Sequence, residues 1–296
     1  MNILITIFKD LSTFTRYAPG VETNMSLDDL QASGLTARKR VESIITAKVF
    51  SAILEEPDDA PLLDALRSGM ANITMATQLI FDSISRRKNN VDVYKYELEA
   101  MKRSYMENYS NAMSTIVQLL TDKEPAKDET DTPVALWRTS RYYRLIESCR
   151  IKSADEFDTI YPIDLSYLFF FRLIPLQKET LDERLSVYYD KLTSDNRTHL
   201  EPGLQLALAK KTIAKALRRF DVLEFPPTIR NLFDDNKAFR HGSTEHDALI
   251  KLADRLDDEA ETLIKNMDAL LSTDTTPDVS SYSAYNRPDD KIIMFP

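Results

Sequence analysis

The chain has 296 residues, of which 43% are hydrophobic and 29% are charged, and its formal net charge is −9. This length suffices for one large domain or two moderate domains, each with its own core. The negative charge disfavours non-specific binding to nucleic acid, and five glycines in the whole chain argue against Gly-rich nucleotide loops and turn-rich β folds. A single cysteine, Cys149, cannot form an internal disulfide, so we expect synthesis in a reducing compartment such as the cytoplasm.

The first residues predict a short strand or extended arm. Their apolar, β-prone run comprises Ile3, Leu4, Ile5, Ile7 and Phe8. The run lacks the basic flank and cleavage site of a signal peptide. No segment approaches the roughly 18 to 20 apolar residues of a membrane span, and the nearest one, 165–176, contains Arg172 and Pro175 and is typical of buried core.

Apolar residues at helical spacing predict a series of amphipathic helices beyond this arm. The expected ranges in chain order are 34–56, 61–84, 91–121, 175–192, 202–223 and 243–271. Ser26 is the expected N-cap of the first helical segment, and Pro61 opens the second helix. Residues 134–146 fit either a strand or a helix, so the fold class is expected to be mainly α.

A charged, proline-containing stretch near the middle predicts a linker. The expected units are an N-terminal arm and helical bundle (1–123), a charged linker (124–133), a second bundle (134–272) and an extended C-terminal arm (273–296). The two halves share an order of features, which indicates two related bundles from an internal duplication, with short extended or β arms at both termini. Two unrelated helical bundles remain an open alternative.

The closing sequence SAYNRPDDKIIMFP, residues 283–296, ends on apolar side chains after a polar stretch. The candidate partner-binding residues of this C-terminal arm are Tyr282, Tyr285, Ile292, Ile293, Met294 and Phe295. Exposed β-prone ends favour aggregation unless they are covered. The tip is therefore expected either to insert into a partner or to pair with residues 3–8 of its own chain.

The sequence contains no arrangement typical of an enzyme. The three histidines, His199, His241 and His246, lack zinc-ligand spacing, Cys149 has no catalytic partner signature, and no Gly-rich phosphate loop is present. The acidic run 257–259 lies on the last helix beside basic residues and is typical of a solvated face. We therefore expect no catalytic residue, no metal ligand and no cofactor.

One cluster combines basic and aromatic side chains. It is the segment WRTSRYYR, with Trp137, Arg138, Arg141 and Arg144 as the candidate contact residues for DNA or for a partner. Arginine and aromatic side chains stack on bases and pair with phosphates, but the same residue types mark protein interfaces. The net charge of −9 favours a protein partner over nucleic acid.

The segment SLDDLQASGLTARKRVESIITAKVFSAIL, residues 26–54, resembles the opening helices of head-to-tail adaptor (connector) proteins of tailed phages. The second half is similar to an uncharacterised family of virion-associated proteins from phages and prophages of Bacteroides-type gut bacteria. The similar segments are IKSADEFDTIY, LIPLQKETLDERL, PGLQLALAKKTIAKAL, LADRLDDEAETLIKNMDALL and NRPDDKIIMFP. The chain exceeds the usual adaptor size, which fits a duplicated bundle.

The resemblance implies a non-enzymatic structural protein of the virion. Such a protein would form a homo-oligomeric ring under the portal at the head–tail junction, and its terminal arms would dock on portal and on tail or neck proteins. It would contact DNA at most in passing and would not associate with a membrane. The alternative function is a DNA-binding or packaging accessory protein that uses the basic-aromatic cluster of residues 137–152.

Overall fold

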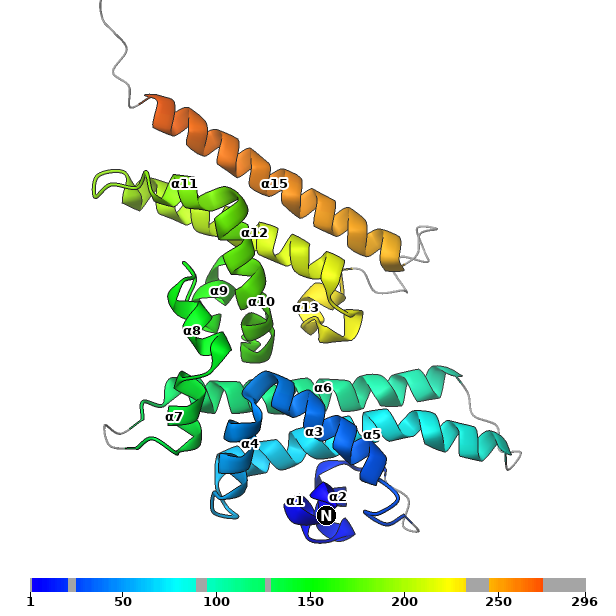
Figure 1. The fold of residues 1–296 in the computed structure, drawn as a ribbon. Helices are drawn as coiled ribbons and strands as arrows, with labels where there is room; N and C mark the ends of the chain where they lie inside the picture. Colours follow the sequence, from blue (N-terminus) through cyan, green and yellow to red (C-terminus); the bar gives the residue numbers. More distant parts are fainter. Residues whose placement is uncertain (1, 21–24, 89–94, 126–128, 233–244, 274–296) are drawn as a thin grey trace, which may run out of the picture.

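The computed structural model describes residues 2–20, 25–88, 95–125, 129–232 and 245–273 (Figure 1). Within these ranges the chain is helical and contains no β-strand, which confirms the mainly α class. None of the helices in these ranges is both long and apolar enough to cross a membrane. The candidate residues of the C-terminal arm lie outside the described residues.

The helices form two bodies (Figure 1). The N-terminal body consists of α1 (Ile3–Phe8), α2 (Leu11–Tyr17), α3 (Gln31–Ile45), α4 (Ala47–Leu54), α5 (Pro61–Lys88), α6 (Lys95–Asp122) and α7 (Pro133–Arg138). Helices α5 and α6 form a long antiparallel hairpin, against which α3 and the short first helices pack. The two predicted long helices of this half are thereby confirmed, each to within a few residues at either end.

The strand expected at residues 3–8 is wrong, because these residues form helix α1. Asn2 caps the helix by accepting a hydrogen bond from the Leu4 backbone N–H at 3.0 Å. Ile3, Leu4, Ile7 and Phe8 are buried, whereas Ile5 is 42% exposed, so the apolar residues follow a helical period of three and four. A Cβ at Gly34 of α3 would lie 2.8 Å from Leu4 Cγ, so only glycine allows α1 to pack this closely on α3. The N-terminal residues belong to the core.

The single helix predicted for 34–56 is also wrong, because the chain breaks at Thr46. Thr46 has a φ of 75° and ends α3, and its side chain accepts a hydrogen bond from the Val49 N–H at the start of α4. The expected N-cap, Ser26, does not cap α3, whose N-cap position is Leu30 and has no side-chain capping bond. Ser26 and Asp29 instead exchange hydrogen bonds in the preceding turn, with Ser26 N donating to Asp29 Oδ2 at 2.9 Å. Residues 27–30 form turns, and the regular helix starts at Gln31.

The C-terminal body holds the remaining helices. They are α8 (Arg141–Glu147), α9 (Ala154–Ile160), α10 (Tyr167–Thr180), the π-helical turn η1 (Leu181–Leu185), α11 (Ser186–Tyr189), α12 (Arg197–Arg219), the 3₁₀ turn η2 (Val222–Glu224), α13 (Pro227–Arg230) and α15 (Glu245–Thr273). Helix α10 begins eight residues before the predicted start at 175 and continues through Pro175. Its buried aromatic residues Phe169, Phe170 and Phe171 explain why: core packing outweighs the hydrogen bond that proline removes.

The two bodies share one continuous core. Helix α10 packs on α6, and α7 packs on α4 and α6. The Trp137 ring on α7 lies 4.8 Å from the Phe171 ring on α10. Side chains from both bodies therefore meet at this junction.

Helix α15 lies along α12, which is its principal neighbour (Figure 1). The side chains that it buries are Leu249, Ala253, Leu256, Ala260, Ile264 and Met267. Gly203 in α12 leaves room for the Met267 side chain, which an added Cβ would meet. The apolar contacts of α15 thus form one strip along α12.

Candidate functional site

The basic-aromatic cluster is split between the core and the surface. Trp137 is fully buried, and its Nε1–H donates to Thr121 Oγ1 at 3.3 Å. The expectation that Trp137 offers a stacking surface to DNA or a partner is wrong, because the indole fills the junction between the two bodies. A buried tryptophan anchors a core by its large apolar area.

Arg138 is also engaged within the chain. Its Nη2 donates to the backbone oxygens of Thr121 at 2.8 Å and Lys123 at 3.0 Å, at the C-terminal end of α6. Its guanidinium lies 4.6 Å from the centroid of the Tyr143 ring. A cation at this end of a helix compensates the carbonyls and the helix dipole, so Arg138 acts in stability.

Arg141 and Arg144 on α8 are exposed. The Arg141 guanidinium lies 5.2 Å from the centroid of the neighbouring Tyr142 ring. The structure thus separates the four predicted contact residues into two that serve the fold and two that face solvent.

A small cavity of about 150 Å³, lined by both polar and apolar residues, lies between the bodies. Its polar lining residues are Glu107, Ser110, Asn111, Ser114, Asp164, Ser166, Glu224 and Arg230. Arg230 is 8% exposed and pairs with Glu107 of α6, and Asp164 accepts a hydrogen bond from the Thr228 N–H at 2.9 Å at the start of α13. These contacts tie α13 to α6 and to the loop before α10, which makes the cavity part of the junction.

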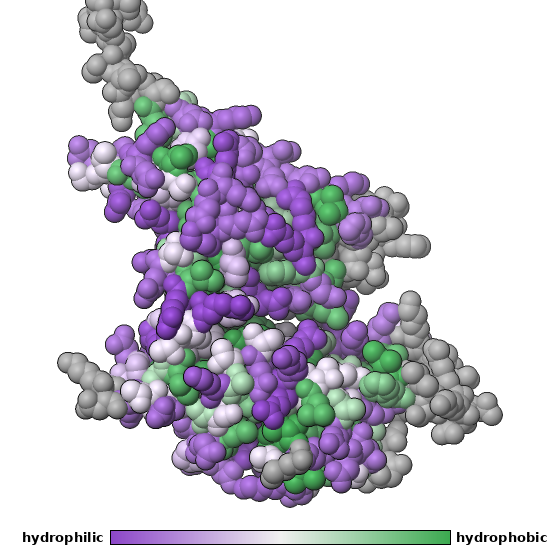
Figure 2. All heavy atoms as spheres, viewed as in Figure 1, coloured by the Kyte–Doolittle hydropathy of each residue, from purple (hydrophilic) through white to green (hydrophobic). Residues whose placement is uncertain are grey.

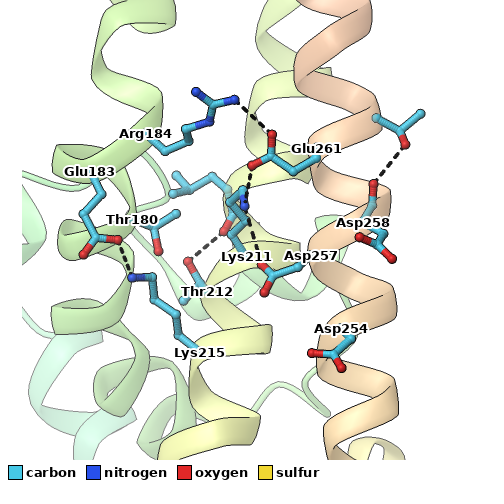
Figure 3. Close-up of polar contacts among 12 residues, drawn as sticks. Thr180, Glu183, Arg184, Lys211, Thr212, Lys215, Asp254, Asp257, Asp258 and Glu261 are labelled. Carbon is cyan, nitrogen blue, oxygen red and sulfur yellow. Dashed lines mark hydrogen bonds and ion pairs between the residues drawn. The ribbon is translucent and has the colours of Figure 1, made fainter.

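A network of ion pairs joins α10, η1, α12 and α15. Figure 3 shows the pairs that link η1, α12 and α15. On one side of α12, Lys215 pairs with Glu179 at 2.7 Å and with Glu183 at 2.6 Å. Arg219 donates to both oxygens of the same Glu179, at 2.6 and 2.7 Å. This part of the network holds α10 and η1 against α12.

The other part of the network holds α15. Lys211 pairs with Glu261 at 2.8 Å, and Arg184 of η1 reaches the second oxygen of Glu261 at 3.0 Å (Figure 3). Lys210 pairs with Glu259 at 2.7 Å, and Arg218 bridges two further carboxylates of α15. The network lines a depression of about 470 Å³ in which each basic side chain is neutralised by a carboxylate.

The ion pairs shift the pKa values of their members. Hydrogen bonds from Arg219 and Lys215 lower the pKa of Glu179 to about 2. Hydrogen bonds from Arg184 and Lys211 lower the pKa of Glu261. Burial opposes the charge on Lys215, but its hydrogen bonds to Glu179 and Glu183 raise its pKa. All these groups are therefore charged at neutral pH and act as ion pairs.

The sequence analysis missed this network. The expectation that 257–259 forms a purely solvated face is partly wrong: Asp258 is exposed, but Asp257 and Glu259 pair with α12. The sequence does contain a signal for it: a basic pattern on α12, KK-x₃-K-x₂-RR, and an acidic pattern on α15, D-x₂-DDE-x-E, have opposite charges. It becomes visible only if the two helices are assumed to be neighbours.

The single cysteine, Cys149, is buried. Burial raises the pKa of Cys149 to about 11, and its Sγ lies 3.8 Å from the Ile174 carbonyl oxygen in the core. A thiol with such a pKa is a poor nucleophile. Within the described residues, no group of histidine, cysteine and carboxylate side chains is arranged to hold a metal ion.

The chain was compared with known families, proteins and structures. No protein-family model matches the chain, and neither the curated proteins nor the solved structures contain a match.

Proposed function

We propose that the chain is a non-enzymatic structural protein of a tailed-phage virion, a head-to-tail connector that assembles into a ring under the portal. The proposal comes from the resemblance of residues 26–54 and of the second half to such proteins. The observation that supports it is the arrangement of the long helices. Two long helical hairpins, α5–α6 and α12–α15, present long outer faces, and one junction of packed side chains joins their bodies (Figure 1).

In this proposal the mechanism is geometric. Each copy supplies preformed helical surfaces, and copies dock side by side into a closed ring. The C-terminal residues Ile292, Ile293, Met294 and Phe295 act as an apolar plug in the portal or in a tail or neck protein. The origin of the two bodies by internal duplication also stays a proposal, suggested by one long hairpin in each.

The test is co-expression with the portal protein of the same phage, followed by purification and mass measurement. The expected result is a complex that contains portal and several copies of this chain. Deletion of residues 290–296 should abolish that complex and leave the thermal unfolding of the free chain unchanged. A chain that never binds portal, or a deletion that lowers only the stability of the free chain, would contradict the proposal.

A second function, DNA binding or a packaging accessory role, is favoured by the exposure of Arg141 and Arg144 on α8. It no longer includes Trp137 or Arg138, which serve the fold. Replacement of Arg141 and Arg144 by alanine should then remove salt-dependent binding to DNA. Equal binding by the wild type and this variant would argue against it.

A further inference from the structure

We infer that the cavity between the two bodies binds a small organic cation, a guanidinium or ammonium group on a short carbon chain. Three features of the molecule point to this ligand: the residues of the cavity wall, the charges that line it, and the backbone conformation of the loop before α10. The connector function neither requires nor excludes such a site.

The cavity lies between α6 on one side and η2, α13 and the start of α10 on the other. Helix α13 is placed between α12 and α6 (Figure 1). Figure 2 shows that the molecule narrows between the two bodies, and that polar and apolar side chains adjoin there. A cavity of about 150 Å³ accommodates a group of the size of a benzene ring. It therefore has room for one small organic molecule.

The two walls of the cavity differ in polarity. On α6, Glu107, Ser110, Asn111 and Ser114 follow at spacings of three and four, so they share one face of the helix. A polar wall opposite an apolar one suits a ligand with a polar head and a carbon chain, and aromatic rings attract cations. The apolar residues of the opposite wall are Leu168, Phe169, Leu223, Phe225, Pro226 and Pro227.

Carboxylates outnumber cations in the lining. Arg230 is 8% exposed and pairs with Glu107, and Glu224 pairs with Arg172 at 2.7 Å. The third carboxylate, Asp164, accepts hydrogen bonds from one residue at the start of α13 and forms no ion pair with another described residue. An anion would be repelled by this lining, whereas a cation would be attracted.

An organic cation fits the cavity better than a metal ion does. Within the described residues, the carboxylates do not form a group that could hold a metal ion. The apolar wall offers carbon atoms in place of the oxygen ligands that hard metal ions require. An ammonium or guanidinium group donates several hydrogen bonds to carboxylate, hydroxyl and amide oxygens, and its carbon chain packs on the apolar wall.

The loop that carries Asp164 has an uncommon backbone conformation. Asp164 and Leu165 have φ values of 56° and 48°, in the left-handed region that residues other than glycine seldom adopt. Asp158 holds the loop, because its Oδ1 accepts hydrogen bonds from the Ile163 N–H at 2.8 Å and the Leu165 N–H at 3.0 Å. Such conformations persist where surrounding contacts fix them, and they cluster at binding sites. The carboxylate of Asp164 is thus held at the cavity before any ligand binds.

The experiment compares two probes of nearly equal shape, the cation butylguanidinium and the neutral butylurea. Isothermal titration calorimetry of the full chain at low salt measures their binding. The cation should bind saturably and at least about tenfold more tightly than butylurea, because only the cation forms charge-assisted hydrogen bonds with the carboxylates. It should also raise the temperature of thermal unfolding. Absence of saturable binding, or equal binding of the two probes, would overturn the inference.

Two variants test the location of the site. Ser110→Leu should abolish binding of both probes, because the larger side chain fills the cavity. Asp164→Asn should weaken binding of butylguanidinium by at least about threefold and leave butylurea unchanged, since only a charge is removed. Circular dichroism checks each fold, and the nearly isosteric Asp164→Asn tests the site even if Ser110→Leu unfolds the chain.

Matched controls carry the same substitutions outside the cavity. Ser104→Leu lies on the same helix α6, and Asp190→Asn follows α11; both residues are exposed and neither lines the cavity. Each control should bind butylguanidinium like the wild type. Unchanged binding by Ser110→Leu, or equal losses in Asp164→Asn and Asp190→Asn, would place the ligand elsewhere and overturn the inference.

A third probe identifies the source of the cation. Acetylated and amidated arginine represents an arginine side chain of a partner protein, whereas butylguanidinium represents a free molecule. Equal affinity for the two probes would show that the cavity admits a side chain from a protein surface. Affinity at least about tenfold lower for the arginine derivative would assign the site to a free cation, because the peptide groups are then excluded at the cavity mouth.

Discussion

The N-terminal body and the α12–α15 pair are held together in different ways. Helix α5 is surrounded by α2, α3, α4 and α6, and its buried residues run along most of its described length. Helix α15 packs on α12 through one strip of apolar residues. Ion pairs from α12 and η1 flank that strip, as Lys211–Glu261 and Lys210–Glu259 show.

This difference predicts how each region responds to its surroundings. Burial of apolar area depends little on salt and pH, whereas partly exposed ion pairs contribute at most about 1 kcal/mol each and are screened by salt. Helix α15 should therefore open more easily than α5. Elements with few buried contacts are those that open first in native proteins.

The largest expected effect concerns the junction between the two regions. Trp137→Ala removes a fully buried indole that packs against Phe171. The variant should lose about 3 to 5 kcal/mol of unfolding free energy, because it leaves a large cavity in a shared core. Urea unfolding followed by circular dichroism measures the loss.

The matched control for the junction is Arg141→Ala on the neighbouring helix, which should change the unfolding free energy by less than about 0.5 kcal/mol. If the two bodies were independent, Trp137→Ala would split the transition into two and leave one half at its original midpoint. A single shifted transition shows that the bodies unfold together.

The next largest effect is expected where α1 packs on α3 in the N-terminal body. Gly34→Ala places a Cβ 2.8 Å from Leu4 Cγ, so α1 must move away from α3. We expect a loss of about 1 to 3 kcal/mol from overpacking. Thermal or urea unfolding of the full chain provides the measurement.

Gly69→Ala is the control for that substitution. In the middle of α5 the nearest side-chain atoms to an added Cβ lie 3.7 Å away, an ordinary contact. The change should stabilise the chain by up to about 1 kcal/mol through helix propensity. Effects of the same sign for the two glycines would contradict the close packing of α1.

The sequence predicts long helices well where the apolar period is uninterrupted. Helices α5, α6 and α15 were expected close to their observed bounds. The predictions were wrong where the local preference of the residues for a strand or a helix break competes with tertiary packing. Residues 3–8 are β-prone by composition, but their apolar spacing suits the helix that Gly34 admits, and Pro175 lies inside α10 because the aromatic residues beside it are buried.

The candidate site was harder to predict than the fold. The segment 137–144 contains adjacent arginines and aromatic residues, but which of them face solvent depends on the junction with α10, which lies about 30 residues further on. The acidic and basic residues of the ion-pair network are separated by 32 to 77 residues in pairs such as Lys215–Glu183 and Arg184–Glu261. Their pairing depends on tertiary structure, which single-helix patterns do not contain.

The smallest effect is expected from the ion pairs that hold α15 on α12 and η1. Hydrogen bonds from Arg184 and Lys211 lower the pKa of Glu261 below its usual value of 4.5. Because this pKa is lower in the folded chain, the ionised carboxylate stabilises the folded state above about pH 4.5. That contribution is lost as the pH falls through the lowered value.

Glu261→Gln should therefore weaken the docking of α15 by less than about 1 kcal/mol at pH 7 and by less at pH 3, since the wild type has by then lost part of the same contribution. Hydrogen exchange of the α15 amides, corrected for the intrinsic pH dependence, measures the effect, with the α6 amides as the reference. Asp258→Asn is the control, because Asp258 is exposed on α15 and its side chain forms no ion pair with the described residues. Equal acceleration of exchange in α6 and α15 would mean that both regions respond alike, and α15 would then open only when the whole chain unfolds.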